Sequence, residues 1–386
     1  MAVLKFDTGA VGPNISFRNS DHQIQGAVSA WSSCRTTAPL ASGKYYVEFL
    51  TPFLPSNGVI VGLMNASAVL NNYTGSNVNS CGIQPTGNVY GWAAATGMGW
   101  LTTDTVSLAF DVGAKKAWWR KNGGAWTGGG DPAAGTSPSG TWAFSGSVYV
   151  AASLFALYST AVVNGGGNFQ YAPPSGFGAI GDALSWSDDS GAQTFDPANV
   201  SALTLSGGNL IATGITDGWW THGIGTRAPT SGQFYVEFTA GNISGTGALV
   251  GLVTPFISAA RPAFGYTAGS DPHFKFWGSG GVSYGGATTG TYSFATGETV
   301  GLAWDMAAQK AWFRKKDGTW LSGDPALGTG GTSLAGMNFL GRGVTPAVSI
   351  ENSPTSLTLN ATGPFVLGAS PWGSARGRSR RLLVVT

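Results

Sequence analysis

The glutamates are the first residues to consider for chemistry, because positioned carboxylates act as general acids and bases. The chain contains four of them, namely Glu48, Glu237, Glu298 and Glu351. A glycoside hydrolase needs two carboxylates about 5–9 Å apart, and a strand supplies them from acidic residues two positions apart. None of the four glutamates has such a neighbour. Glu48 and Glu237 instead predict buried structural carboxylates, each paired with an arginine such as Arg120 or Arg314, because a buried charge needs a partner.

The histidines and aspartates form no second constellation. His22, His222 and His273 lie far apart in the sequence and lack the spacing of metal ligands. Four aspartates recur near Gly, Ala or Pro, where Asp usually supports a turn; they are Asp111, Asp131, Asp305 and Asp324. We therefore expect no catalytic residues, no metal and no cofactor.

Two cysteines, Cys34 and Cys81, occur in the first half of the chain alone. One possible bridge cannot make a disulfide scaffold. Two buried thiols are favoured over a disulfide, and both alternatives stay open at this point.

The composition excludes several classes of protein. Of 386 residues only 10% are charged, whereas 61 are Gly and 15 are Trp. Low charge with many Trp residues argues against disorder and fits short strands joined by Gly-rich turns. The net charge of +2 gives no electrostatic case for nucleic-acid binding. No run reaches the roughly 18–20 apolar residues of a membrane-spanning helix, and residues 1–7 lack a signal-peptide pattern, so we expect no membrane insertion.

The sequence contains an internal duplication. Residues 106–126 and 300–320 are identical at 12 of 21 positions, and residues 42–49 match residues 231–238. Because the offset stays near 190 residues, each copy is a whole domain rather than a solenoid repeat. We predict one domain at 1–178, a linker at 179–194, a second domain at 195–370 and a basic C-terminal tail at 371–386. The tail carries Arg376, Arg378, Arg380 and Arg381.

The periodicity within each copy is that of strands. Residues 44–50 and 233–239 are rich in aromatic and β-branched residues. Residues 106–112 and 116–121, like 300–306 and 310–316, predict a hairpin in each copy. No stretch shows a sustained helical stripe of apolar residues. The sequence therefore predicts an all-β protein built from two tandem antiparallel β-sandwiches.

These motifs resemble the SPRY domain, the core of the B30.2 module. The order is SGKYYVEF at 42–49, VGL at 61–63, VSLAFDVGAKKAWWRKNG at 106–123 and GDPAAGT at 130–136, repeated in the second copy. The GDPA after the hairpin is similar to the variant found in bacteriophage and bacterial proteins. The resemblance implies two concanavalin A-like sandwiches of SPRY type. It also implies binding of proteins, or of glycans, by loops at one rim, and no catalysis.

Aromatic residues outside the duplicated motifs are the candidates for that binding. Trp and Tyr flanked by Gly in loops suit stacking on a sugar ring or a hot spot in a protein interface, whereas the alternative is that they plug the open rim. The candidates are Tyr90, Trp92 and Trp100 in the first copy, with Trp219, Trp220, His222, Arg261, Trp277 and Tyr284 in the second. We expect the first copy to anchor the protein and the second to bind.

The leading hypothesis is a non-enzymatic virion protein of a tailed bacteriophage, located on the particle surface as a fibre or decoration component. Its partners would be other virion proteins and a host-surface glycan or protein, and a homo-oligomer is left open. The alternative is a stand-alone carbohydrate-binding module, secreted or attached to a bacterial surface. A glycosidase is the least favoured hypothesis, for want of paired carboxylates.

Overall fold

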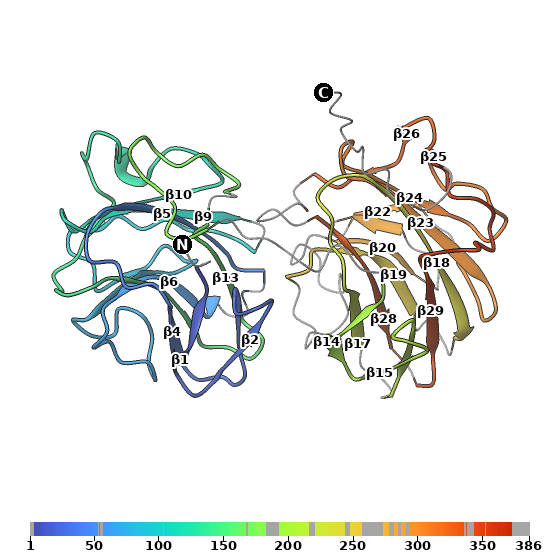
Figure 1. Cartoon of the computed structure of the whole chain (residues 1–386), viewed down its shortest axis with the longest axis horizontal. Helices are drawn as coiled ribbons and strands as arrows, with labels where there is room; N and C mark the ends of the chain where they lie inside the picture. The colour runs from blue at the N-terminus through green and yellow to red at the C-terminus, as the bar shows by residue number, and fades with distance from the viewer. Residues whose placement is uncertain are drawn as a thin grey trace, which may run out of the picture. The chain divides into compact units, whose positions relative to one another are not determined.

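The computed structural model describes most of the chain, and it divides into two compact units, residues 1–185 and 186–386 (Figure 1). The described residues are 4–52, 54, 57–102, 104–166, 169–182, 193–215, 221–243, 248–256, 273–277, 282–284, 287–290, 293–335, 337, 343–351 and 353–372. For strand residues 198–199, 201, 273–277, 282–284 and 287–290 only the backbone is described.

The first unit contains two antiparallel sheets. The first sheet has the order β1 (Phe6–Val11), β4 (Ser32–Thr36), β12 (Tyr149–Leu154), β6 (Val59–Met64), β7 (Ser80–Ile83) and β8 (Val89–Tyr90). The second sheet has the order β11 (Gly140–Thr141), β10 (Lys116–Lys121), β9 (Thr105–Asp111), β5 (Lys44–Leu50), β13 (Thr160–Asn164), β3 (Gln23–Gly26) and β2 (Ile15–Arg18).

The second unit repeats this strand order. Its first sheet is β14 (Phe195–Ser201), β17 (Thr221–Gly225), β28 (Thr345–Ile350), β19 (Ala248–Val253), β20 (His273–Trp277), β21 (Val282–Tyr284) and β22 (Ala287–Gly290). Its second sheet is β15 (Leu203–Ser206), β16 (Ile211–Gly214), β29 (Ser356–Asn360), β18 (Gln233–Asn242), β23 (Thr299–Asp305), β24 (Lys310–Arg314) and β27 (Thr332–Ser333). A separate pair, β25 (Gly323–Asp324) and β26 (Thr329–Gly330), follows β24 in the chain. The predicted tandem of antiparallel sandwiches is therefore confirmed.

Strand alternation explains how each sandwich is filled. Successive side chains point to opposite faces, so Val47 and Phe49 of β5 enter the core between the sheets. Tyr46, between them in the sequence, joins a second cluster with Trp118 and Phe177 on the other face of the same sheet. Each sandwich thus buries aromatic residues on both faces of its second sheet.

The recurring aspartates support turns, as the sequence predicts. Asp111 Oδ1 accepts the backbone N–H of Ala114 at 2.9 Å, and Asp305 Oδ1 accepts that of Ala308 at 2.9 Å. Asp131 and Asp324 accept backbone N–H groups in the same way. Within the described ranges, no three His, Cys, Asp or Glu side chains gather in an arrangement that could hold a metal ion.

Cys34 and Cys81 are both free thiols and both fully buried. They lie on β4 and β7 of the same sheet, with β12 and β6 between them. This confirms the prediction of two buried thiols. Burial raises the pKa of both, which keeps them protonated and unreactive at neutral pH.

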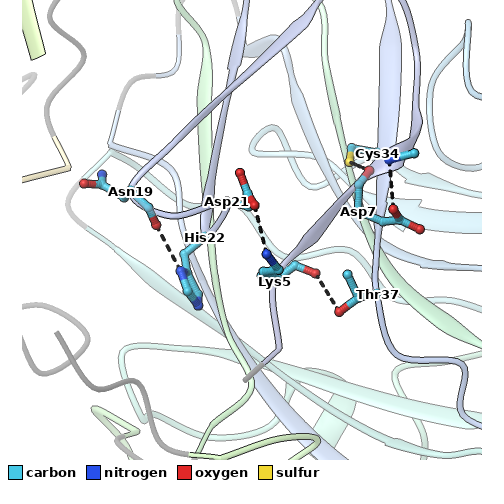
Figure 2. Close-up of polar contacts among 8 residues, drawn as sticks. Lys5, Asp7, Asn19, Asp21, His22, Cys34 and Thr37 are labelled. Atoms are coloured by element: carbon cyan, nitrogen blue, oxygen red, sulfur yellow. Dashed lines mark hydrogen bonds and ion pairs between the residues drawn. The ribbon is translucent and has the colours of Figure 1, made fainter. Parts of the chain in front are cut away.

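The turn between β2 and β3 is tied to the start of β1, as Figure 2 shows. Lys5 Nζ lies 3.0 Å from Asp21 Oδ2, and the N–H of Phe6 donates to the carbonyl of Asp21 at 2.8 Å. Three consecutive residues of this turn, Asn19, Ser20 and Asp21, have positive φ angles of 50°, 53° and 68°. The left-handed region costs a residue with a Cβ about 1–2 kcal/mol, so this turn is strained.

The second sandwich builds the equivalent turn without that strain. Gly207, Gly208 and Asn209 have φ angles of 58°, 68° and 64°, and two of the three are glycines, which adopt such angles readily. The N–H of Phe195 donates to the carbonyl of Asn209 at 2.8 Å, as Phe6 does to Asp21. The two turns therefore share one backbone path with different side chains.

No helix in the described part of the chain is long and apolar enough to cross a membrane.

Candidate functional site

The two repeated glutamates, the first candidates for catalysis, are fully buried on the outer faces of the second sheets. The carboxylate of Glu48 accepts the backbone N–H groups of Gln170 and Tyr171, both at 2.8 Å, and the hydroxyl of Tyr46 at 3.0 Å. Residues 169–177, which we name the first strap, are thereby fixed across the sheet. Burial raises the pKa of the Glu48 carboxyl, and the backbone N–H donors and Tyr46 act in the opposite direction.

Glu237 repeats this arrangement in the second sandwich. It accepts the N–H of Val366 at 2.7 Å, the N–H of Leu367 at 2.9 Å and the hydroxyl of Tyr235 at 2.9 Å. Residues 365–372 form the second strap. Phe365 packs edge-on against Tyr235, with ring centroids 4.8 Å apart.

The predicted pairing of these glutamates with arginines needs correction. Among the described residues neither Glu48 nor Glu237 forms an ion pair; the backbone N–H groups of the straps satisfy them instead. Arg120 lies 4.4 Å from the ring centroid of Trp126 and donates to the carbonyl of Ala172 at 2.6 Å. Arg314 likewise donates to the carbonyl of Ala369 at 3.1 Å. The arginines therefore hold the straps directly, and the carboxylates are structural.

The rim where the chain passes from β8 to β9 is closed by tryptophans. Trp100 is 3% exposed, and its Nε1 donates to Thr51 Oγ1 at 3.1 Å. Trp92 is half-buried, with its ring centroid 5.0 Å from that of Trp119 and 6.2 Å from that of Trp142. Two of the predicted binding residues, Trp92 and Trp100, thus pack where they plug the sandwich.

A long loop, residues 65–79, lies over the outer face of the first sheet. It is fixed there by hydroxyl groups: Ser33 Oγ donates to the carbonyl of Asn72, and Ser153 Oγ accepts the N–H of Thr74 at 2.6 Å. Ser33 and Ser153 also lie 2.9 Å apart and are fully buried. The loop is therefore a fixed platform rather than a free segment.

This loop completes a chain of four aromatic rings on the first sandwich, which we name the aromatic row. Its members are Phe155, Trp31, Tyr73 and Tyr90, and all four are half-buried. The ring centroids of Phe155 and Trp31 are 5.2 Å apart, those of Trp31 and Tyr73 5.4 Å, and those of Tyr73 and Tyr90 5.2 Å. Successive ring planes are tilted by 47°, 57° and 63°. The rings support one another, so each holds its orientation without a ligand.

The row lies at one end of the sandwich. Trp31 directly precedes β4 and Phe155 directly follows β12, and these strands pair at that end through Ser32 and Leu154. Val28 and Leu157, on the same two connections, are 45% and 40% exposed. Loops at a rim are where the SPRY resemblance implies binding.

The polar groups around the row are uncharged. Residues 23–34, 49–103 and 132–181, which carry the four rings and the loop, contain no Asp, Glu, Lys, Arg or His. The hydroxyl of Tyr90 donates to Gln84 Oε1 at 2.9 Å. Trp31 Nε1 and the Tyr73 hydroxyl form no hydrogen bond with the described residues, and neither does the side-chain amide of the exposed Asn71. These three groups are available to a ligand.

Tyr90 is the predicted binding residue that the structure places in the row. Trp31, Tyr73 and Phe155 were missed. Trp31 had a signal in the sequence, because it directly precedes Ser32 just as Trp220 directly precedes Thr221. Ser32 and Thr221 pair with Leu154 and Ile350 at equivalent positions of the two sheets. For Tyr73 and Phe155 the proximity arises from the folding of the loop, which no local pattern reveals.

His222 lies elsewhere than the sequence suggested. It is fully buried within β17, where it pairs in register with Ser349. Ser33 holds this position in the first sandwich, paired in register with Ser153. Strand β17 begins at Thr221, so His222 is part of the sheet and not of an exposed rim.

The remaining candidates of the second copy are placed by backbone alone or not described. Trp277 ends β20 and pairs with Leu249, and Tyr284 ends β21 and pairs with Phe274. Trp219, Trp220 and Arg261 lie outside the described residues.

Comparison with known proteins gives a similarity in structure only, since no family model and no curated protein matches the chain. The SPRY domain of human HERC1 is 14% identical, with 41% of this chain and 96% of that domain covered at a TM-score of 0.34. The PSpry domain of TRIM65 is 11% identical, with coverage of 42% and 91% at a TM-score of 0.31. Stonustoxin is 19% identical, with coverage of 44% and 27% at a TM-score of 0.31. Two of these three are SPRY domains, the family that the sequence motifs resemble; the sandwich assignment itself rests on the strand order given above.

Proposed function

We propose that this chain is a non-enzymatic binding protein of a tailed-bacteriophage particle, located on the surface as a fibre or decoration component. In this proposal the aromatic row of the first sandwich contacts the partner. The partner is a molecule of the host surface, and other virion proteins hold the chain on the particle.

One observation carries the proposal: four mutually supporting, half-buried aromatic rings lie at a rim that presents unpaired Trp31 and Tyr73 polar groups. Half-buried Trp and Tyr with a free polar end are typical of binding hot spots. Rings fixed in advance also reduce the entropy lost on binding. The sequence analysis expected the second copy to bind, but the described surface with these properties belongs to the first copy, and the proposal follows it.

The absence of catalysis is part of the proposal. Glu48 and Glu237, the repeated carboxylates, are buried beneath the straps and already accept three hydrogen bonds each. A general acid or base must reach the proton it transfers, and these two groups are covered. The assignment to a phage particle rests on the duplicated motifs with the GDPA variant and on the low charge.

Mass spectrometry of purified particles tests the location, and adsorption of particles carrying Trp31→Ala tests the site. We expect the chain in the particles and normal incorporation of the variant with reduced adsorption to host cells. Absence of the chain from the particles would refute the virion assignment and leave the stand-alone binding module.

A further inference from the structure

We infer that the ligand of the aromatic row is a neutral carbohydrate chain. This inference rests on the proposed binding function of the row and adds the chemical class of the ligand. The surface that carries it consists of Phe155, Trp31, Tyr73 and Tyr90 with the amide-rich loop beside them.

The arrangement of the rings is the first argument. Successive centroids lie 5.2–5.4 Å apart, with tilted planes, so the row is stepped rather than one flat platform. The face of an aromatic ring is electronegative and attracts the weakly positive C–H groups on the face of a sugar ring. A stepped row suits a ligand whose own rings follow one another along a chain, whereas a single flat aromatic ligand would meet one ring only.

The polar groups are the second argument. Sugar hydroxyls both donate and accept hydrogen bonds, and so do the side chains that the row offers, namely the Tyr73 hydroxyl and the Asn71 amide. Trp31 Nε1 adds a donor. A few polar groups placed among aromatic rings is the usual composition of a small-molecule site.

The missing charge is the third argument. An anionic or cationic ligand would leave its charge without a partner here, because residues 23–34, 49–103 and 132–181 carry none. Arg35, which follows the first of these segments, donates to the carbonyl of Ala66 at 3.0 Å and lies 4.5 Å from the ring centroid of Tyr149. A protein partner would favour a surface with arginine among the aromatics and a polar rim. The uncharged surroundings therefore favour a neutral glycan.

The test is affinity electrophoresis of the full chain through gels that contain one polysaccharide each. Dextran, mannan and galactan are the neutral probes, and polygalacturonate and hyaluronate are the charged ones. We expect at least one neutral polysaccharide, and neither charged one, to retard the protein. Trp31→Ala and Tyr73→Ala should weaken that binding about 30-fold, as for a hot-spot residue. Tyr73→Phe should weaken it about 3- to 10-fold, since it removes one hydrogen bond.

Trp126→Ala is the matched control, because Trp126 is also half-buried and aromatic but lies on the second sheet against Arg120. It should bind like the unchanged protein, and chemical unfolding of every variant verifies that it is folded. Retardation by charged polysaccharides alone, or neutral binding that survives Tyr73→Ala, overturns the inference. No retardation by any neutral probe together with Tyr73-dependent binding to host cells overturns the glycan but leaves the proposed function. Loss of both dependences refutes both.

Discussion

The carboxylate of Glu48 accepts the backbone N–H of Tyr171, a residue 123 positions later in the chain, at 2.8 Å. Glu237 does the same for Leu367 in the second sandwich. Replacing Glu48 with Gln puts an N–H₂ group against one of the strap's N–H donors. We expect Glu48→Gln and Glu237→Gln each to lower the free energy of unfolding by about 1–3 kcal/mol, measured by urea unfolding.

Glu298→Gln is the control for that pair of variants. Glu298 is only partly buried and forms an ion pair with Lys316, and such pairs contribute about 0–1 kcal/mol. If Glu48→Gln costs no more than Glu298→Gln, the carboxylates do not hold the straps.

The left-handed turn between β2 and β3 predicts an increase in stability. Ser20 is exposed with φ of 53°, whereas its counterpart Gly208 has φ of 68°. Ser20→Gly relieves the left-handed strain at some cost in chain entropy, so we expect a net gain of about 0.5–1 kcal/mol. Gly208→Ser is the reciprocal variant, because a Cβ there would meet no atom within 4 Å. It should lose a similar amount, and a loss on Ser20→Gly would contradict the strain.

The fold was largely predictable from the sequence because the duplication and the strand periodicity are local patterns. Residues 116–121, predicted as a strand, are β10 to the residue, and residues 44–50 are β5. The predictions that failed concern side-chain partners. Glu48 was expected to pair with Arg120, but its partners come from a strap more than 120 residues later, and no spacing rule reaches that far.

The binding surface was less predictable for a related reason. Tyr90 was a candidate, but its neighbours in the aromatic row come from three other segments, which the 65–79 loop and the ends of β4 and β12 bring together. Trp100 was a candidate because Gly surrounds it in the sequence, yet it is buried. Flanking glycines indicate a loop but not whether the side chain in it points inward.

The burial of His22 predicts a dependence of stability on pH. Burial lowers the pKa of His22 below its ordinary value of 6.5, so the unfolded chain binds more protons than the folded one in that window. The free energy of unfolding should therefore rise with pH and be complete above about 6.5, and it should fall as acid is added. Leu210 holds this position in the second sandwich, so we expect His22→Leu to flatten the dependence between about pH 5 and 7. Urea unfolding at a series of pH values measures it, and an unchanged slope would show that His22 is not its source.

Trp100 should matter for stability and not for binding. Its side chain is buried at the rim and bonded to Thr51, so Trp100→Ala should cost about 3–5 kcal/mol. Trp100→Phe, which keeps most of the apolar volume, should cost less and leave ligand binding unchanged. Loss of binding in a folded Trp100→Phe variant would return Trp100 to the candidate binding residues.

The central claim is that the aromatic row of the first sandwich is the binding surface. The most direct measurement is binding of the fluorescently labelled full chain to host cells, with Tyr73→Ala compared against Trp126→Ala. The account predicts about 30-fold weaker binding for folded Tyr73→Ala and unchanged binding for Trp126→Ala. Equal binding by the unchanged protein and Tyr73→Ala would contradict it.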